Sequence, residues 1–243
     1  MRSVIQSRKK TSFIWPEQRG FRTLKKLMNT DPNWLRTLER KIPWLAVPNI
    51  AVLLVTLQVI GFLLFLSDPA WMPRLILFPD LVKHGEVWRL LSYLAVPLST
   101  SIIWAIFALW FLYSVLNWIE SEWGAFKTTL YVLVSIVITG AFSLIFSYPV
   151  YDAVDFNSTL FLASAALFPD LEILLYFILP VKMKYLGYLA LAFLAFRVFQ
   201  GNWMDRLFLV AIYSNYLVFF GPSIVNRFQM WRRRRAYRRN LRN

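Results

Sequence analysis

The sequence has no cysteine, a single histidine and few acidic residues. Without cysteine there can be no disulfide, no thiol nucleophile and no cysteine-ligated metal. One imidazole, that of His84, cannot form a multi-histidine metal centre and leaves little scope for histidine acid–base chemistry. These absences exclude most thiol enzymes and many metalloenzymes, and we expect neither a metal site nor a cofactor.

Hydrophobic residues, by contrast, make up 58% of the 243 residues, and aromatic residues make up 18%. They gather in segments of membrane length, which is typical of a polytopic membrane protein. The fold expected is all-α, with six spans at 45–66, 102–119, 126–146, 158–168, 185–199 and 207–224. The fourth has about 11 residues and cannot cross a hydrocarbon core of roughly 30 Å alone, so we expect it at the centre of the bundle.

Basic residues outnumber acidic ones by 27 to 13, and 19 of the 27 lie in 1–44 and 227–243. Six spans put both ends on one side, together with Lys127, Lys182 and Lys184. That side then holds 22 of the 27 basic residues, as the positive-inside rule requires. We expect basic cytoplasmic tails at 1–44 and 225–243 around a membrane domain at 45–224, in a bacterial inner membrane. The tails, with an amphipathic stretch at 34–40, favour anionic lipid headgroups over nucleic acid.

Two further segments are neither spans nor simple linkers. Residues 67–92 mix tryptophan, charged and apolar residues, and we interpret them as a partly inserted loop domain. Residues 169–184 have proline and charge at both ends, which indicates an interfacial connector on the cytoplasmic side.

Three motifs stand out along this pattern. The first is Trp88-Arg89, within Gly85-Glu86-Val87-Trp88-Arg89-Leu90-Leu91, just ahead of the second span. The second is Glu120 with Gly124, at the end of that span. The third is the connector, with Pro169-Asp170, Phe177, Lys182 and Tyr185-Leu186. In order and spacing these resemble motifs of the rhomboid-like superfamily, including Derlins, over about residues 45–224. The resemblance implies a six-helix core in which Trp88, Arg89, Glu120 and Gly124 are structural.

Active members of that superfamily are intramembrane serine proteases, and their chemistry is missing here. Ser158 falls at the nucleophile position, but Phe156 and Thr159 replace the two glycines that shape the turn. Ser214 or Asn215 falls where the family has its histidine, and neither can accept a proton near pH 7. The family's oxyanion residues fall on Trp104 and Ala108. We therefore expect a protein that is not an enzyme.

The resemblance then implies a pseudoprotease or Derlin-like factor that binds transmembrane helices of client proteins between the second and fifth helices. Partners would include a membrane protease or AAA ATPase in quality control or degradation. Polar residues around the short fourth span could hydrogen-bond a client helix. The candidate client-binding residues are Asn157, Ser158, Ser214 and Asn215.

Other interpretations stay open at this point. A protease with a non-standard site would need His84 as the base for Ser158, or Ser164 as another nucleophile. Glu120 and Glu122 could be an acid–base pair, although a helix-end contact that fixes the next loop is favoured. Asp152 and Asp155 could bind a cation. A transporter or channel would need ionisable residues well inside the spans, and none is evident.

Overall fold

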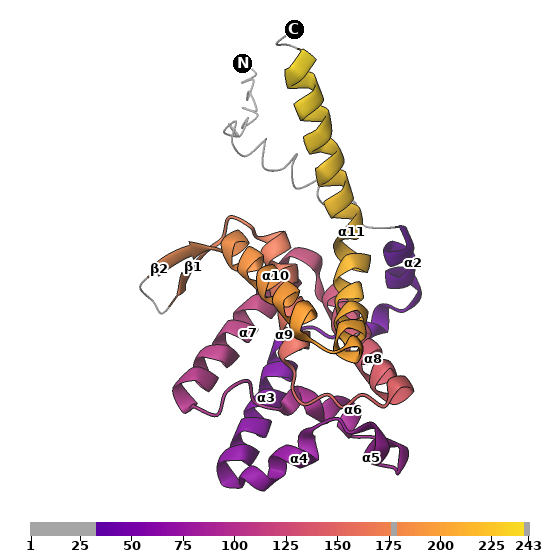
Figure 1. Ribbon diagram of the computed structural model, residues 1–243, viewed down its shortest axis with the longest axis vertical. Coiled ribbons are helices and arrows are strands. Elements are labelled where there is room, and N and C mark those ends of the chain that lie inside the picture. The colour runs from indigo at the N-terminus through magenta and orange to yellow at the C-terminus, as the bar shows by residue number, and fades with distance from the viewer. Residues whose placement is uncertain (1–32, 176–178, 241–243) are drawn as a thin grey trace, which may run out of the picture. The chain divides into compact units, whose positions relative to one another are not determined.

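The computed structural model describes residues 33–175 and 179–240, with side chains for 34–173 and 180–221. The chain divides into a unit of residues 34–222 and a second unit of residues 1–33 and 223–243. The first unit carries the features considered below. The described elements are, in chain order, α2 (Asn33–Lys41), η1 (Pro43–Leu45), α3 (Ile50–Ser67), η2 (Pro69–Trp71), α4 (Met72–Leu75), α5 (Pro79–Lys83), α6 (Arg89–Ser92), η3 (Tyr93–Ala95), α7 (Ile102–Trp123), α8 (Ala125–Phe146), α9 (Val154–Leu167), β1 (Glu172–Leu175), β2 (Leu179–Lys182), α10 (Met183–Gln200) and α11 (Trp203–Asn240) (Figure 1).

Among the described residues, three helical segments are long and apolar enough to cross a membrane: Pro43–Ser67, Ile102–Trp123 and Ala125–Phe146. They coincide with the first three expected spans and identify the chain, by length and composition, as a membrane protein. The helices α9, α10 and α11 cover the fourth, fifth and sixth expected spans. The six-span arrangement itself stays a prediction.

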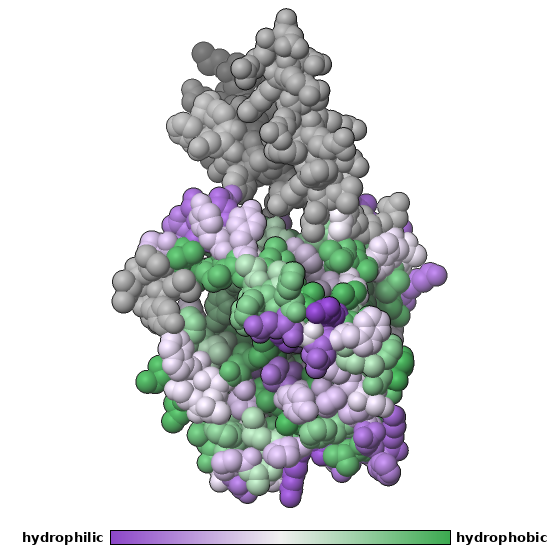
Figure 2. All heavy atoms as spheres, in the orientation of Figure 1, coloured by the Kyte–Doolittle hydropathy of each residue, from purple (hydrophilic) through white to green (hydrophobic). Residues whose placement is uncertain are grey.

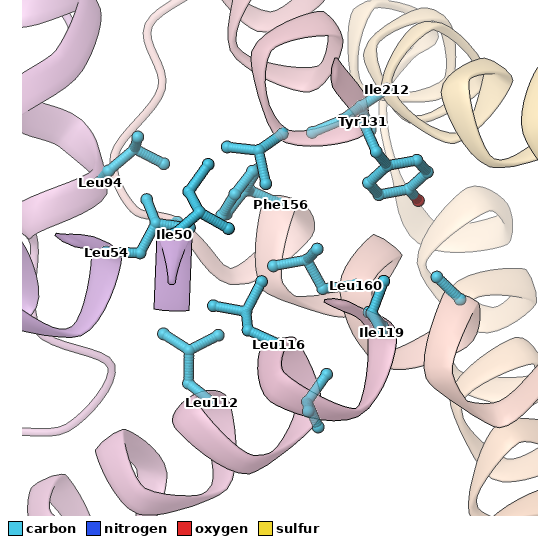
Figure 3. Close-up of a cluster of buried hydrophobic side chains, with 14 of the residues drawn as sticks. Ile50, Leu54, Leu94, Leu112, Leu116, Ile119, Tyr131, Phe156, Leu160 and Ile212 are labelled. Atoms are coloured by element: carbon cyan, nitrogen blue, oxygen red, sulfur yellow. The ribbon is translucent and has the colours of Figure 1, made fainter. Parts of the chain in front are cut away.

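The core of the bundle is built from segments far apart in the sequence. Ile50 and Leu54 of α3 meet Leu116 of α7, Leu160 of α9 and Ile212 of α11, all almost fully buried (Figure 3). Because α9 contributes Phe156, Leu160 and Ala163 to this core, the short helix is surrounded by other helices, as the sequence predicts.

The loop region 67–92 is structured, as expected, by short helices. Its middle is fixed to the α8–α9 connection by two backbone hydrogen bonds between Leu77 and Val150, at 3.1 and 3.0 Å. Helix α3 meets η3 closely at Gly61, where an added Cβ would lie 1.8 Å from the Ala95 carbonyl oxygen. Only glycine fits this contact.

The connector corrects the expectation of a purely helical chain, because it contains a β-hairpin. Strands β1 and β2 pair antiparallel, with Glu172 opposite Lys182 and Ile173 opposite Val181. Pro180 is tolerated because neither strand of a two-stranded sheet lies between two others. Prolines bound the segment at 169 and 180, and cross-strand pairs stabilise a hairpin there instead of a helix.

The two ends differ from simple tails. The amphipathic stretch forms α2, whose Leu35 is buried in the core. Residues 1–32 of the expected N-terminal tail lie outside the described residues. At the other end, α11 does not stop at residue 224 but continues as a helix to Asn240. Arginine and alanine favour helix, and no glycine or proline follows Pro222.

Candidate functional site

The candidate site is centred on α9, which has 14 residues and a length of about 21 Å. Helices α7 and α10 both pack against it (Figure 1). On the α7 side, Phe161 contacts Phe111, with ring centroids 5.7 Å apart. On the α10 side, Gly187 faces Ala165, and a Cβ at Gly187 would lie 2.9 Å from the Ala165 Cβ. Small residues thus allow α9 and α10 to approach closely.

An ion pair joins the first turn of α9 to the last turn of α10. Arg197 Nη1 donates to Asp155 Oδ1, and Arg197 Nη2 donates to Oδ2 at 3.3 Å. The Asp155 side chain is 11% exposed, and the Arg197 side chain is 37% exposed. The pair therefore fixes the two helices at this end of the bundle.

Two tyrosines extend this polar group. The Tyr213 hydroxyl of α11 lies close to the Ser158 side chain and to the Asp155 carboxylate. Nearby, the Tyr148 hydroxyl donates to Asp205 Oδ1 at 2.7 Å. Burial, reinforced by the Asp205 carboxylate, raises the pKa of Tyr148 above its ordinary value, so its phenol stays protonated at neutral pH.

On α11, the described neighbour of Ser158 is Tyr213, one residue before Ser214. A neutral phenol does not take a proton from a serine hydroxyl near pH 7. The other candidate base, His84, lies in the first loop, where its Nδ1 is 2.7 Å from the Asp80 carbonyl oxygen.

Ser214 and Asn215 are committed to contacts within the bundle. The Ser214 hydroxyl donates to the Ala211 carbonyl on its own helix, at 2.6 Å. Asn215 is 1% exposed, and its Nδ2 donates to the Tyr131 carbonyl at 3.0 Å and to Ser135 Oγ at 2.6 Å. Asn215 Nδ2 thus joins α11 to α8, while Asn215 Oδ1 is buried without a hydrogen-bond partner among the described residues.

Asn157 differs from Asn215 in that its side chain makes no hydrogen bond at all within the described residues. Both polar atoms of its side chain are buried, and neither has a hydrogen-bond partner among the described residues. Asn157 lies one turn before Phe161, so both project from the side of α9 that meets α7. A buried carboxamide without partners costs free energy, roughly 1–3 kcal/mol for each unmet group.

The structural motif residues lie apart from this group. Arg89 is buried, and its guanidinium donates to Glu86 Oε2 at 2.6 Å and to the carbonyls of Pro73 and Ile76 at 2.8 and 2.7 Å. As expected from the sequence, the arginine satisfies loop carbonyls. Trp88 is 59% exposed beside it.

At the end of α7, the Glu120 carboxylate accepts from the Asn49 backbone N–H. The expected helix-end contact is present, but it holds the segment before α3 and not the next loop. Gly124 has φ +83°, a conformation that favours glycine, and is the single residue between α7 and α8.

The remaining carboxylates have local partners. Asp152 Oδ1 accepts from the Val154 backbone N–H at the start of α9, and Asp155 is paired with Arg197. Within the described residues, no group of three or more metal-ligating side chains occurs.

Sequence reasoning missed Arg197 and Tyr213. Arg197 lies within the expected span 185–199, and an arginine near the end of a span calls for a buried acidic partner. The acidic residue three positions before Ser158 was that signal. Comparison of the chain with family models, with curated proteins and with solved structures finds no match, so the resemblance to the rhomboid-like superfamily rests on the sequence motifs.

Proposed function

We propose that the chain is a non-catalytic, rhomboid-like membrane protein that binds transmembrane segments of client proteins. In this proposal it passes them to a quality-control or degradation machine, as an adaptor for a membrane protease or AAA ATPase. The observation that carries the proposal is the buried, unpartnered carboxamide of Asn157 on α9. A client helix with a polar residue would supply the missing hydrogen bonds, each worth about 0.5–2 kcal/mol in a membrane.

A route to Asn157 is consistent with the packing of the helices. Because α7 and α10 both pack on α9, a client could enter between them. Their outward residues are apolar and more than half exposed, among them Ile103 and Ile106 on α7, and Leu189, Phe193 and Phe196 on α10. Figure 2 shows hydrophobic residues over much of this face and a hollow beside α10, on the side toward α7.

The absence of catalysis in the proposal is supported by the neighbours of Ser158. Its α11 neighbour is Tyr213, and the histidine of the chain donates within its own loop. A serine without a base is a weak nucleophile. Wild-type protein should therefore show no more labelling by a fluorophosphonate probe than Ser158→Ala, and Ser158-dependent labelling would restore the protease alternative.

The location and orientation in the proposal follow the charge distribution. The chain would lie in a bacterial inner membrane with both termini cytoplasmic, where its basic ends meet anionic headgroups. Protease accessibility of tags at the two termini, in spheroplasts and in inverted vesicles, tests this orientation.

Site-specific photocrosslinking tests the client model. A photoreactive residue at Ile106 or Leu189 should capture single-span membrane proteins, and Asn157→Leu should reduce capture several-fold. A photoreactive residue at Val137, on the outward face of α8, controls for random collisions. Asn117→Leu makes the same chemical change on α7, at a half-buried position. Equal capture from Val137, or equal loss with Asn117→Leu, would contradict the proposal.

A further inference from the structure

A recess of about 610 Å³ lies in the first-loop region, apart from α9. We call it the loop recess. Its apolar lining comes from Leu64 at the end of α3, Trp71 of η2, Leu75 of α4 and Trp88. Its charged lining comes from Arg74, Glu86 and Arg89. The volume is within the range of small-molecule sites, and apolar walls with a few charges are their usual composition.

The loop recess has two arginines and one glutamate in its lining, so one positive charge is not balanced by a carboxylate. The carboxylate of Glu86 is paired with Arg89, which also serves two loop carbonyls. Arg74, in contrast, is exposed and has no acidic partner within the described part of the chain. Its guanidinium lies over the Trp71 ring, 4.8 Å from the centroid. Stacking on the indole fixes the orientation of the guanidinium while leaving its N–H donors free for a ligand.

The recess also lies at the level where the first membrane-length helix ends. Leu64 is one turn before Ser67, the last residue of a helix able to cross the membrane. Tryptophans collect at the level of lipid headgroups, and the recess has two of them, Trp71 and Trp88, both exposed. Its ligand would therefore meet headgroups on one side and acyl chains on the other.

From these observations we propose that the loop recess binds the headgroup of a phospholipid. The phosphodiester accepts hydrogen bonds from Arg74, whose planar fork matches two phosphate oxygens. The glycerol backbone and the first methylenes of the chains cover Leu64, Leu75 and the tryptophan rings. One excess cation matches one phosphodiester charge. Free inorganic phosphate offers the same contact to Arg74 but leaves the apolar walls exposed, so the lipid is the better fit.

Native mass spectrometry of the full-length protein in detergent tests the proposal. Delipidated protein is titrated with phosphatidylglycerol and, separately, with inorganic phosphate. Wild type should retain phosphatidylglycerol, and Arg74→Gln should weaken its binding by roughly tenfold, the expected loss of one charge-assisted contact. Arg74→Lys should recover part of the binding, since the charge returns without the fork.

The control is Lys83→Gln, which removes another basic residue of the same loop. Lys83 donates to Ser147 and does not line the recess. Binding of phosphatidylglycerol that Arg74→Gln leaves unchanged, or that Lys83→Gln lowers equally, would overturn the proposal. So would binding of inorganic phosphate as tight as that of the lipid. Thermal unfolding of each variant shows that the fold is intact.

Discussion

Glu120 of α7 accepts a hydrogen bond from the backbone N–H of Asn49, 71 residues earlier, at 2.8 Å. Asn49 precedes α3 in a left-handed conformation, and its side chain does not cap the helix. The carboxylate thus satisfies a backbone donor that would otherwise lack a partner at the start of α3. A contact this far apart in sequence fixes how the first and second spanning helices meet.

Glu120→Ala should lower the free energy of unfolding by about 1 kcal/mol, since it removes this acceptor. Glu120→Gln keeps a carbonyl oxygen at the same place and should cost much less. Thermal unfolding of the purified protein in detergent measures both. Equal losses in the two variants would indicate that charge, and not the acceptor, is what matters.

Arg89→Ala should be among the most destabilising substitutions in the first loop. It leaves the carbonyls of Pro73 and Ile76 and the Glu86 carboxylate without their donor. We expect a loss of roughly 2–4 kcal/mol in unfolding free energy. Trp88→Leu, at the exposed neighbouring position, should lose less in detergent. Similar losses at both positions would refute the assignment of Arg89 as the residue that fixes the loop.

Gly61→Ala should destabilise strongly, because its Cβ would meet the backbone oxygen of Ala95 at 1.8 Å. Overpacking of this kind costs typically 1–3 kcal/mol or more. Gly140→Ala is the matched control: its Cβ would meet the flexible end of Leu90, at 3.1 Å. Comparison of the two melting temperatures checks the prediction, which fails if Gly140→Ala is the worse variant.

The Asp155–Arg197 pair should show coupling in a double-mutant cycle. Asp155→Asn, Arg197→Gln and the double variant together should give about 1–2 kcal/mol of interaction free energy. The exposed pair of Lys184 and Asp170, 3.3 Å apart, should give close to zero because solvent screens it. A cycle for Asp155 and Arg197 as weak as the exposed one would show that the pair does not hold α10 to α9.

Much of the fold could be predicted because hydrophobic length is a strong signal. The first three spans were located to within a few residues, and the short length of α9 correctly indicated a central helix. The connector was harder. Prolines at both ends excluded a span, but the pairing of Ile173 with Val181 depends on local cross-strand contacts that hydropathy does not report.

The site was less predictable than the spans. Rotation about a helix axis decides which side chains face a neighbour, and Tyr213, one residue before Ser214, lies close to Ser158. Sequence spacing places residues along a helix axis more reliably than around it. The contacts of Arg89, in contrast, could be predicted from the sequence. A buried guanidinium in a loop needs hydrogen-bond acceptors, and the carbonyls of the loop are the nearest ones.

Gly124 is the only residue between α7 and α8, so the end of α7 at Trp123 can move little relative to the start of α8. The same end of α7 is clamped by Trp123, whose ring stacks on Phe219 and Phe220 of α11 and meets Tyr131 edge-on. The opposite end, at Ile102, follows a stretch without helix or strand at 96–101. Any outward swing of α7 is therefore a pivot about Gly124, widest at Ile102. In the proposed function, a client helix would therefore enter first from the face of the membrane at which Ile102 lies.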